Sequence, residues 1–145
     1  MFVRIVLPFA VVLLSAAAGP AQDTRKELEK LQGEWTMVSM ETKGMKARDE
    51  SVKQYKLTIK GDQWTVTTLK GVGGKATFKI DPSKNPKTID LTFEFNKKGT
   101  PSRGIYKLEG DTLTLCRTAG DRERPKEFKT TEEAGILVVW KRAKD

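Results

Sequence analysis

Gly33-Glu34-Trp35 and Trp140-Lys141-Arg142 bracket the part of the chain that decides the fold. Between them, apolar residues recur at every second position, as in Tyr55 to Ile59, where lysine and threonine fill the alternate places. A period of two is typical of strands that have one buried face and one solvated face. We therefore expect an all-β protein whose first and last strands meet and close a barrel.

The connections between these strands are short. Lys60-Gly61-Asp62 and Glu109-Gly110-Asp111 predict tight hairpins. Gly71–Gly74 predicts a loose turn, Asp81–Pro86 predicts a rigid one, and the polar stretch Lys43–Lys53 has room for a helical turn or a mobile lid. No helix between strands is long enough for a parallel crossover, so we expect an antiparallel up-and-down barrel of eight or nine strands.

The alternation also predicts the barrel interior. An eight-stranded barrel has room for its own side chains or for one small ligand. The expected interior residues are bulky, which favours a filled barrel or a pocket restricted to one mouth; they are Tyr55, Leu57, Ile59, Trp64, Phe78, Ile80, Leu91, Phe93, Phe95, Tyr106 and Leu108. Phe128 is expected in a further strand that Pro125 introduces.

The chain begins with the pattern of a signal peptide. Arg4 precedes the apolar stretch Ile5–Leu14, and the small residues of Ser15–Ala21 resemble a cleavage site after Ala18 or, preferably, Ala21. The apolar stretch is shorter than the roughly 20 residues that span a bilayer. We expect residues 1–21 to be removed, leaving 22–145 as one periplasmic or extracellular domain without a transmembrane segment.

A short helix is predicted before the first strand. Thr24 and Glu27 have the spacing of a capping box, and Leu28 and Leu31 share one helix face. Gly33 can end the helix in a left-handed conformation. The two leucines are then placed to close one mouth of the barrel.

The composition excludes several classes of chemistry. The chain has no histidine and one cysteine, Cys116, which excludes histidine-based catalysis, thiolate metal sites and an internal disulfide. Losing Arg4 with the signal peptide lowers the net charge from +8 to +7. This charge suits either a solvated surface or a polyanionic partner. Cys116 is expected to be half-buried; an intermolecular disulfide or a thiol activated by Arg117 is the alternative.

Gly33-x-Trp35 resembles the signature of lipocalins, in which the tryptophan closes one barrel end against a basic residue after the last strand. Lys141 and Arg142 occupy that place, so Gly33, Trp35 and Arg142 are the expected closure residues. The mature chain is more closely similar to a family of small exported lipocalin-like domains of unknown function, abundant in planctomycete bacteria. The segments that carry the resemblance are Leu31–Trp35, Leu57–Asp62, Ile80–Pro82, Ile89–Leu91, Gly104–Tyr106, Gly110–Cys116 and Arg124–Phe128. The resemblance implies the fold and export, and it supplies no catalytic residues.

The candidate ligand-binding residues are Trp64, Phe93 and Tyr106 as pocket walls, and Arg124 as an anion-binding group at the mouth, unless a salt bridge pins it. They favour a binding module for a small amphiphilic or anionic molecule. The alternative is an interaction protein with a filled barrel that uses its basic outer face on a protein or envelope polymer, without specific nucleic-acid binding. We expect no cofactor, metal or catalytic residue. A hydrolase that uses two carboxylates is the weakest hypothesis; its candidates are Asp62, Asp90, Glu94, Glu109, Asp111 and Glu127.

Overall fold

The computed structural model describes residues 20–119, 122–132 and 135–144, so residues 1–19 of the expected signal peptide lie outside it. It contains a 12-residue helix, a single helical turn and nine strands. In chain order these are α1 (Pro20–Leu31), β1 (Gly33–Thr42), β2 (Met45–Lys46), α2 (Asp49–Val52), β3 (Lys56–Lys60), β4 (Gln63–Thr68), β5 (Gly71–Asp81), β6 (Lys87–Phe93), β7 (Ser102–Glu109), β8 (Thr112–Arg117) and β9 (Ile136–Arg142).

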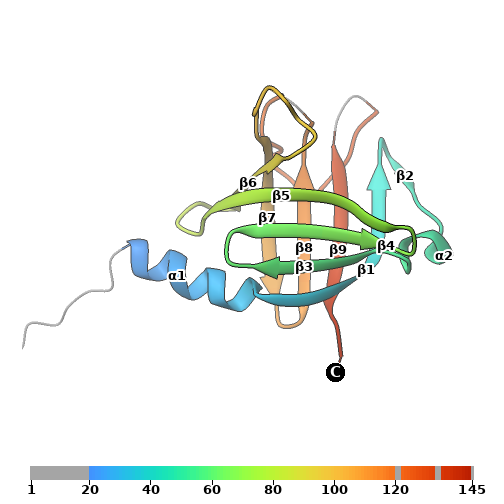
Figure 1. Cartoon of the computed structure of the whole chain (residues 1–145). Coiled ribbons are helices and arrows are strands. Elements are labelled where there is room, and N and C mark those ends of the chain that lie inside the picture. Colours follow the sequence, from blue (N-terminus) through green and yellow to red (C-terminus); the bar gives the residue numbers. More distant parts are fainter. Residues whose placement is uncertain (1–19, 120–121, 133–134, 145) are drawn as a thin grey trace, which may run out of the picture.

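The strands form a closed antiparallel barrel. From β3 to β9 each strand pairs with the next, β1 pairs with both β3 and β9, and the two-residue β2 is added to the end of β1. The β1–β9 pairing runs from Trp35 opposite Arg142 to Thr42 opposite Ile136. The prediction of an all-β up-and-down barrel is therefore confirmed (Figure 1).

The turns follow the sequence signals with one exception. Gly61 and Gly110 have φ angles of 60° and 58° in the two predicted hairpins, a conformation that favours glycine. The stretch Lys43–Lys53 contains the expected helical turn, α2. The glycine run Gly71–Gly74 is not a turn, however, because it pairs with β4 as the start of β5.

The barrel interior is packed with apolar side chains. Ten of the eleven predicted interior residues belong to this core or pack against it. Leu31 of α1 closes one end, and Val52 of α2 enters the core. The buried cluster comprises Leu31, Trp35, Met37, Val52, Leu57, Ile59, Trp64, Ala76, Phe78, Ile89, Leu91, Tyr106, Leu113, Leu115, Val138 and Trp140.

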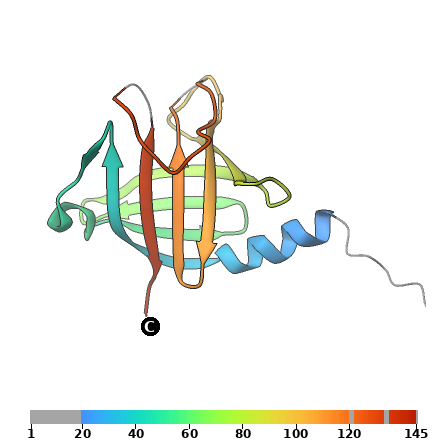
Figure 2. The same ribbon diagram turned by 180° about the vertical axis from the view of Figure 1, so that it is seen from behind.

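The sequence prediction is wrong for two aromatic residues. Phe95 is 74 % exposed, because β6 ends at Phe93 and Phe95 lies in the following loop. Phe128 belongs to no strand; it lies in the segment 122–132, which we call the strap. The strap crosses the outside of the barrel (Figure 2), with Lys107 Nζ 5.0 Å from the Phe128 ring centroid and Lys129 O accepting from Cys116 Sγ.

We call the barrel end that α1 covers the closed end. The predicted closure residues Gly33, Trp35 and Arg142 lie together there. The Arg142 guanidinium lies 4.3 Å from the Trp35 ring centroid and donates to Gln32 O and Lys30 O at 2.9 and 2.7 Å. Trp35 Nε1 donates to Leu31 O at 3.0 Å. A Cβ on Gly33 would lie 3.4 Å from Arg142 Nη1, so glycine leaves room for the guanidinium. One cation thus joins the helix C-terminus to both closing strands.

The start of α1 differs from the prediction. The described part of the helix already includes Pro20, so Thr24 lies inside it rather than at its N-cap. Glu27 contacts the barrel: its Oε1 lies 2.8 Å from Lys87 Nζ and accepts from Tyr106 OH at 3.3 Å. These contacts hold the polar side of α1 on the closed end.

Candidate functional site

Two of the four predicted ligand-binding residues lie in the packed core. Trp64 is 3 % exposed and makes edge-to-face contacts with Phe78 and Trp140, at centroid distances of 5.9 and 6.5 Å. Tyr106 is buried near the closed end, where Glu27 accepts from its phenol. Burial, together with the nearby Glu27 carboxylate, raises the pKa of Tyr106 well above its usual value. Both aromatic rings therefore serve packing.

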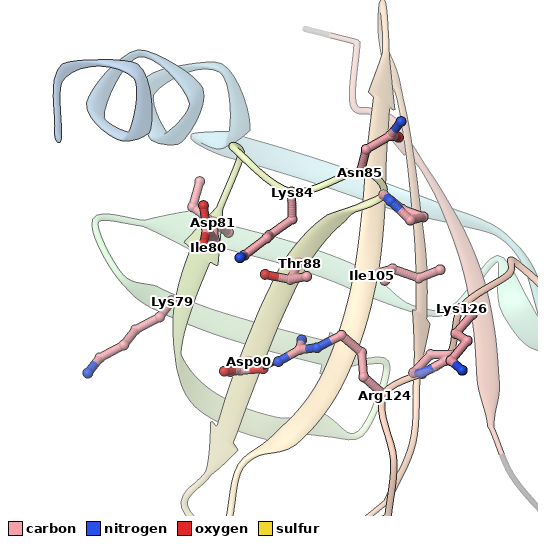
Figure 3. Close-up of a pocket in the computed structure, with 12 residues that line it drawn as sticks. Lys79, Ile80, Asp81, Lys84, Asn85, Thr88, Asp90, Ile105, Arg124 and Lys126 are labelled. Atoms are coloured by element: carbon pink, nitrogen blue, oxygen red, sulfur yellow. Dashed lines mark ion pairs between the residues drawn. The ribbon is translucent and has the colours of Figure 1, made fainter. Parts of the chain in front are cut away.

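Arg124 lies on the outer face of the barrel, not at a mouth. Its Nη1 donates to Ile89 O and Gly104 O at 3.2 and 2.7 Å, and its Nη2 is 2.8 Å from Asp90 Oδ1 (Figure 3). A salt bridge therefore pins the loop, but its partner is Asp90 on β6 and not one of the carboxylates near Arg124 in the sequence. Its donors are directed to the barrel wall, so Arg124 anchors the strap.

A hollow of about 820 Å³ surrounds this anchor; we call it the outer hollow. Ile80, Pro86, Ile105 and Pro125 give it apolar surface, and its charged lining residues include Asp81 and Asp90 as well as lysines. Ser83 donates to Asp81, and these hydrogen bonds lower the pKa of that carboxyl. In Figure 3 Lys79 points away from the other labelled residues. The outer hollow is therefore a surface of mixed charge.

A second hollow, of about 510 Å³, lies at the barrel end opposite α1, which we call the open end. Phe93 is the predicted residue that lines it, and Phe95 stacks on Phe93 with a centroid distance of 5.1 Å and an interplanar angle of 22°. Its charged lining residues are Lys97, Lys98 and Arg117, all cations. We call this feature the mouth hollow.

Arg117 is the central cation of the mouth hollow. It follows Leu113 and Leu115 along β8 at two-residue steps, so its side chain points to the barrel interior as theirs do. Its guanidinium lies 4.8 Å from the Phe93 ring centroid, and Nη1 donates to Ser102 Oγ at 3.2 Å. Within the described ranges, no carboxylate forms an ion pair with it.

Arg117 is partly buried without a counter-charge among the described residues, and this affects its pKa. Desolvation lowers the pKa of Arg117 to about 10. Ser102 gives only a neutral acceptor, because its own hydroxyl donates to Thr118 O. A guanidinium has five N–H donors, and among the residues that the structure describes only Ser102 accepts from this one. Arg117 therefore retains charge and donors for an anion.

The loop between β6 and β7 is ordered by its own hydrogen bonds. Asn96 Nδ2 donates to Thr100 O at 2.7 Å, and Asn96 Oδ1 accepts from Lys98 N at 3.2 Å. Gly99 N also donates to Asn96 O at 3.0 Å. These contacts fix the loop that presents Phe95, Lys97 and Lys98 beside Arg117, so the cationic wall of the mouth hollow is a built feature.

Sequence reasoning did not identify Arg117 or Ser102 as site residues. The sequence did contain a signal for Arg117. Leu113, Leu115 and Arg117 are spaced two residues apart, so Arg117 is a charged residue at a position that faces the barrel interior. Ser102 lies two residues before Gly104 and four before Tyr106, again on the inward set. The four predicted residues are not brought together: Phe93 lines the mouth hollow, Arg124 the outer hollow, and Trp64 and Tyr106 the core.

The hypothesis of a reactive Cys116 is not supported. Its thiol points outward beneath the strap and donates to Lys129 O at 3.5 Å, while Arg117 points inward from the same strand. Burial raises the pKa of the Cys116 thiol. A raised pKa lowers the fraction of nucleophilic thiolate at neutral pH, which is the opposite of activation by Arg117.

Metal sites and membrane-spanning helices are absent from the described residues. The described part of the chain contains no group of three or more acidic or cysteine side chains arranged to hold a metal ion, and none of its helices combines the length and apolarity needed to cross a bilayer. Comparison of the chain with protein-family models, with curated proteins and with solved structures gave no match.

Proposed function

We propose that the protein is an exported binding module that holds a small amphiphilic anion at the open end of its barrel, in the periplasm or outside the cell. The anionic group of the ligand pairs with Arg117, and its apolar part lies against Phe93 and Phe95. The resemblance to small exported lipocalin-like domains supports the compartment and the type of function, and the mouth hollow supports the position of the site.

The observation that carries the proposal is the partly buried Arg117 without an acidic partner in the described chain. Buried charges in proteins are normally paired, because an uncompensated charge away from water is costly. A guanidinium also recognises carboxylate, sulfonate or phosphate oxygens through two parallel hydrogen bonds. The free protein bears the free-energy cost of a desolvated Arg117 that lacks an acidic partner among the described residues. This cost is explained if the anionic group of a ligand pairs with Arg117.

The packed interior limits the size of this ligand. Trp64, Phe78 and Trp140 fill the middle of the barrel, so a long chain cannot follow the barrel axis without displacing core residues. The mouth hollow lies outside this layer and is bordered by Phe93. We therefore propose a compact ligand, with an aromatic or short aliphatic portion beside its anionic group.

The first test uses anilinonaphthalene sulfonate, which combines a sulfonate with aromatic rings and fluoresces when bound. Arg117→Gln should weaken its binding at least about tenfold, since a hydrogen bond to a charged group is worth about 1.5–3 kcal/mol. Arg103→Gln is the matched control, because it removes the same charge from an exposed position of β7. Thermal melts of the three proteins establish that each is folded.

Equal dye affinity in the wild type and the Arg117→Gln variant would contradict the proposed site and favour the interaction-protein alternative. The natural ligand can then be sought by native mass spectrometry of the protein from its host's exported fraction. A discrete extra mass that is released on denaturation, and that the Arg117→Gln variant lacks, would identify it.

A further inference from the structure

Exposed apolar side chains gather in the turns of the open end. Of the five large hydrophobic residues that are exposed in the described chain, only Val38 lies outside these turns. Met45 lies in the β1–β2 hairpin, Leu69 and Val72 flank the β4–β5 turn, and Phe95 lies in the β6–β7 loop. Their exposed fractions run from 60 % for Val72 to 84 % for Leu69. Such exposure at separate turns serves no packing within the molecule.

Each of these turns also carries lysine. The three segments are Thr42–Lys46, Thr68–Gly74 and Phe95–Pro101, which we call the three tips; they contain two, one and two lysines. The acidic residues beside them are Glu94, which begins the β6–β7 loop, and Glu41, which lies opposite Lys46 in the β1–β2 pair. The neighbouring α2 bears Asp49 and Glu50, which Arg48 and Lys53 at its two ends balance in charge. The open end therefore combines apolar points with positive charge.

The tips come from distant parts of the sequence but share the part of the barrel that lies away from α1. Figures 1 and 2 both place the β6–β7 loop and the β1–β2 hairpin at the top of the barrel, and the β4–β5 turn at its side next to α2, all three away from α1. The closed end is instead covered by α1 and Arg142. The three tips thus border the part of the barrel that α1 leaves uncovered.

We propose that the three tips dock the open end on an anionic phospholipid bilayer. Aliphatic and aromatic side chains at loop tips can enter the interfacial region of a bilayer, while neighbouring lysines keep their ammonium groups at the level of the lipid phosphates. A protein partner usually binds one continuous apolar patch. Here the exposed apolar side chains are instead separate, each with a lysine close by in the same tip. The third tip also lines the mouth hollow, through Phe95, Lys97 and Lys98, so the test of docking uses the other two tips.

The test measures co-sedimentation with vesicles made of equal parts phosphatidylcholine and phosphatidylglycerol, and with vesicles of phosphatidylcholine alone. The helices and strands that the structure describes lie within residues 20–144, so the chain from Pro20 onward is used. We compare the wild type with Lys46→Glu/Lys70→Glu at the tips and with Lys26→Glu/Lys60→Glu at the closed end. The two double variants change the net charge equally, and all four lysines are exposed.

The wild type should bind the anionic vesicles, and added salt should weaken the binding. The tip variant should bind about thirtyfold more weakly, because each of its two lysines near an anionic surface contributes roughly a fivefold step. The closed-end control should stay within about threefold of the wild type. Met45→Ser/Leu69→Ser, which keeps every charge, should also lose about tenfold through its apolar contribution.

Equal weakening by the two charge variants would overturn the proposal, since it would mean that only net charge matters. Unchanged binding by Met45→Ser/Leu69→Ser would overturn it as well. The binding would then be purely ionic, and a purely ionic surface would bind any polyanion and not a bilayer in particular. Failure of the wild type to sediment with anionic vesicles at low salt would do the same. None of these variants alters Arg117 or the other residues of the mouth hollow, so dye binding is expected to survive in each of them.

Discussion

Replacing Arg117 by methionine should stabilise the ligand-free protein while abolishing anion binding. The substitution keeps an unbranched side chain of similar length beside Phe93 and removes the desolvated charge. A site that is preorganised for an anion bears a cost in its empty state. The sign of the stability change therefore distinguishes a binding arginine from a structural one.

The magnitude follows from the surroundings of the guanidinium. The lowering of its pKa to about 10 corresponds to a cost of about 3 kcal/mol for the charged form at neutral pH. The contact with Phe93 and the hydrogen bond to Ser102 offset about 1 kcal/mol each, and the variant loses both. The net gain should be about 1 kcal/mol, or a Tm higher by about 4 °C for a domain of this size.

Arg142→Met is the matched control for this experiment. Arg142 stacks on Trp35, donates to two helix carbonyls and lies 3.4 Å from Asp111 through Nε. Removing these contacts should destabilise the fold by about 2–4 kcal/mol. Urea denaturation of the three proteins, followed by tryptophan fluorescence, measures both changes. If Arg117→Met lowers the stability by 1 kcal/mol or more, as a structural arginine would, the binding assignment is refuted.

Two further changes test the barrel itself. Gly104→Ala should cost about 3 kcal/mol in urea denaturation, because its Cβ would lie 2.7 Å from Cys116 O; a cost below 1 kcal/mol would contradict this close approach of β7 and β8. Tyr106 should keep its proton at a pH where an unfolded tyrosine loses it, so the folded state loses stability as the pH rises above 10. Absorbance titration of Tyr55→Phe, which leaves Tyr106 as the sole tyrosine, should show no phenolate until the protein unfolds, and ionisation in the folded protein would refute the burial.

The fold was predictable because the signals that specify it are local. Gly61 and Gly110 mark hairpins through the φ angles they permit, and the alternation around Leu57 and Leu91 fixes which face is buried. The prediction of buried residues failed where strand pairing ended without a local sequence signal. Phe95 continues the alternation of β6, but no partner on β7 faces it in the ladder, so it becomes exposed.

The site was less predictable because it depends on contacts between distant segments. Arg124 was expected to bind an anion or to form a salt bridge close by in the sequence, yet its partners are Asp90 and two strand carbonyls that the strap brings near. Arg117 was passed over, although its inward position follows from the alternation. Whether a charged side chain is paired depends on which strands lie beside it. That information is absent from the spacing along one strand.

The contacts that Arg142 makes between the two ends of the barrel domain affect how the chain folds. Arg142 donates to Gln32 O, 110 residues earlier in the sequence, and β9 supplies the edge that β1 needs for closure. Contacts of such separation form late and slowly, because a long loop must be ordered first. A chain still emerging from a ribosome lacks β9 and has two open sheet edges. Closure therefore waits for the release of the last strand, and until then the open edges expose the nascent chain to aggregation.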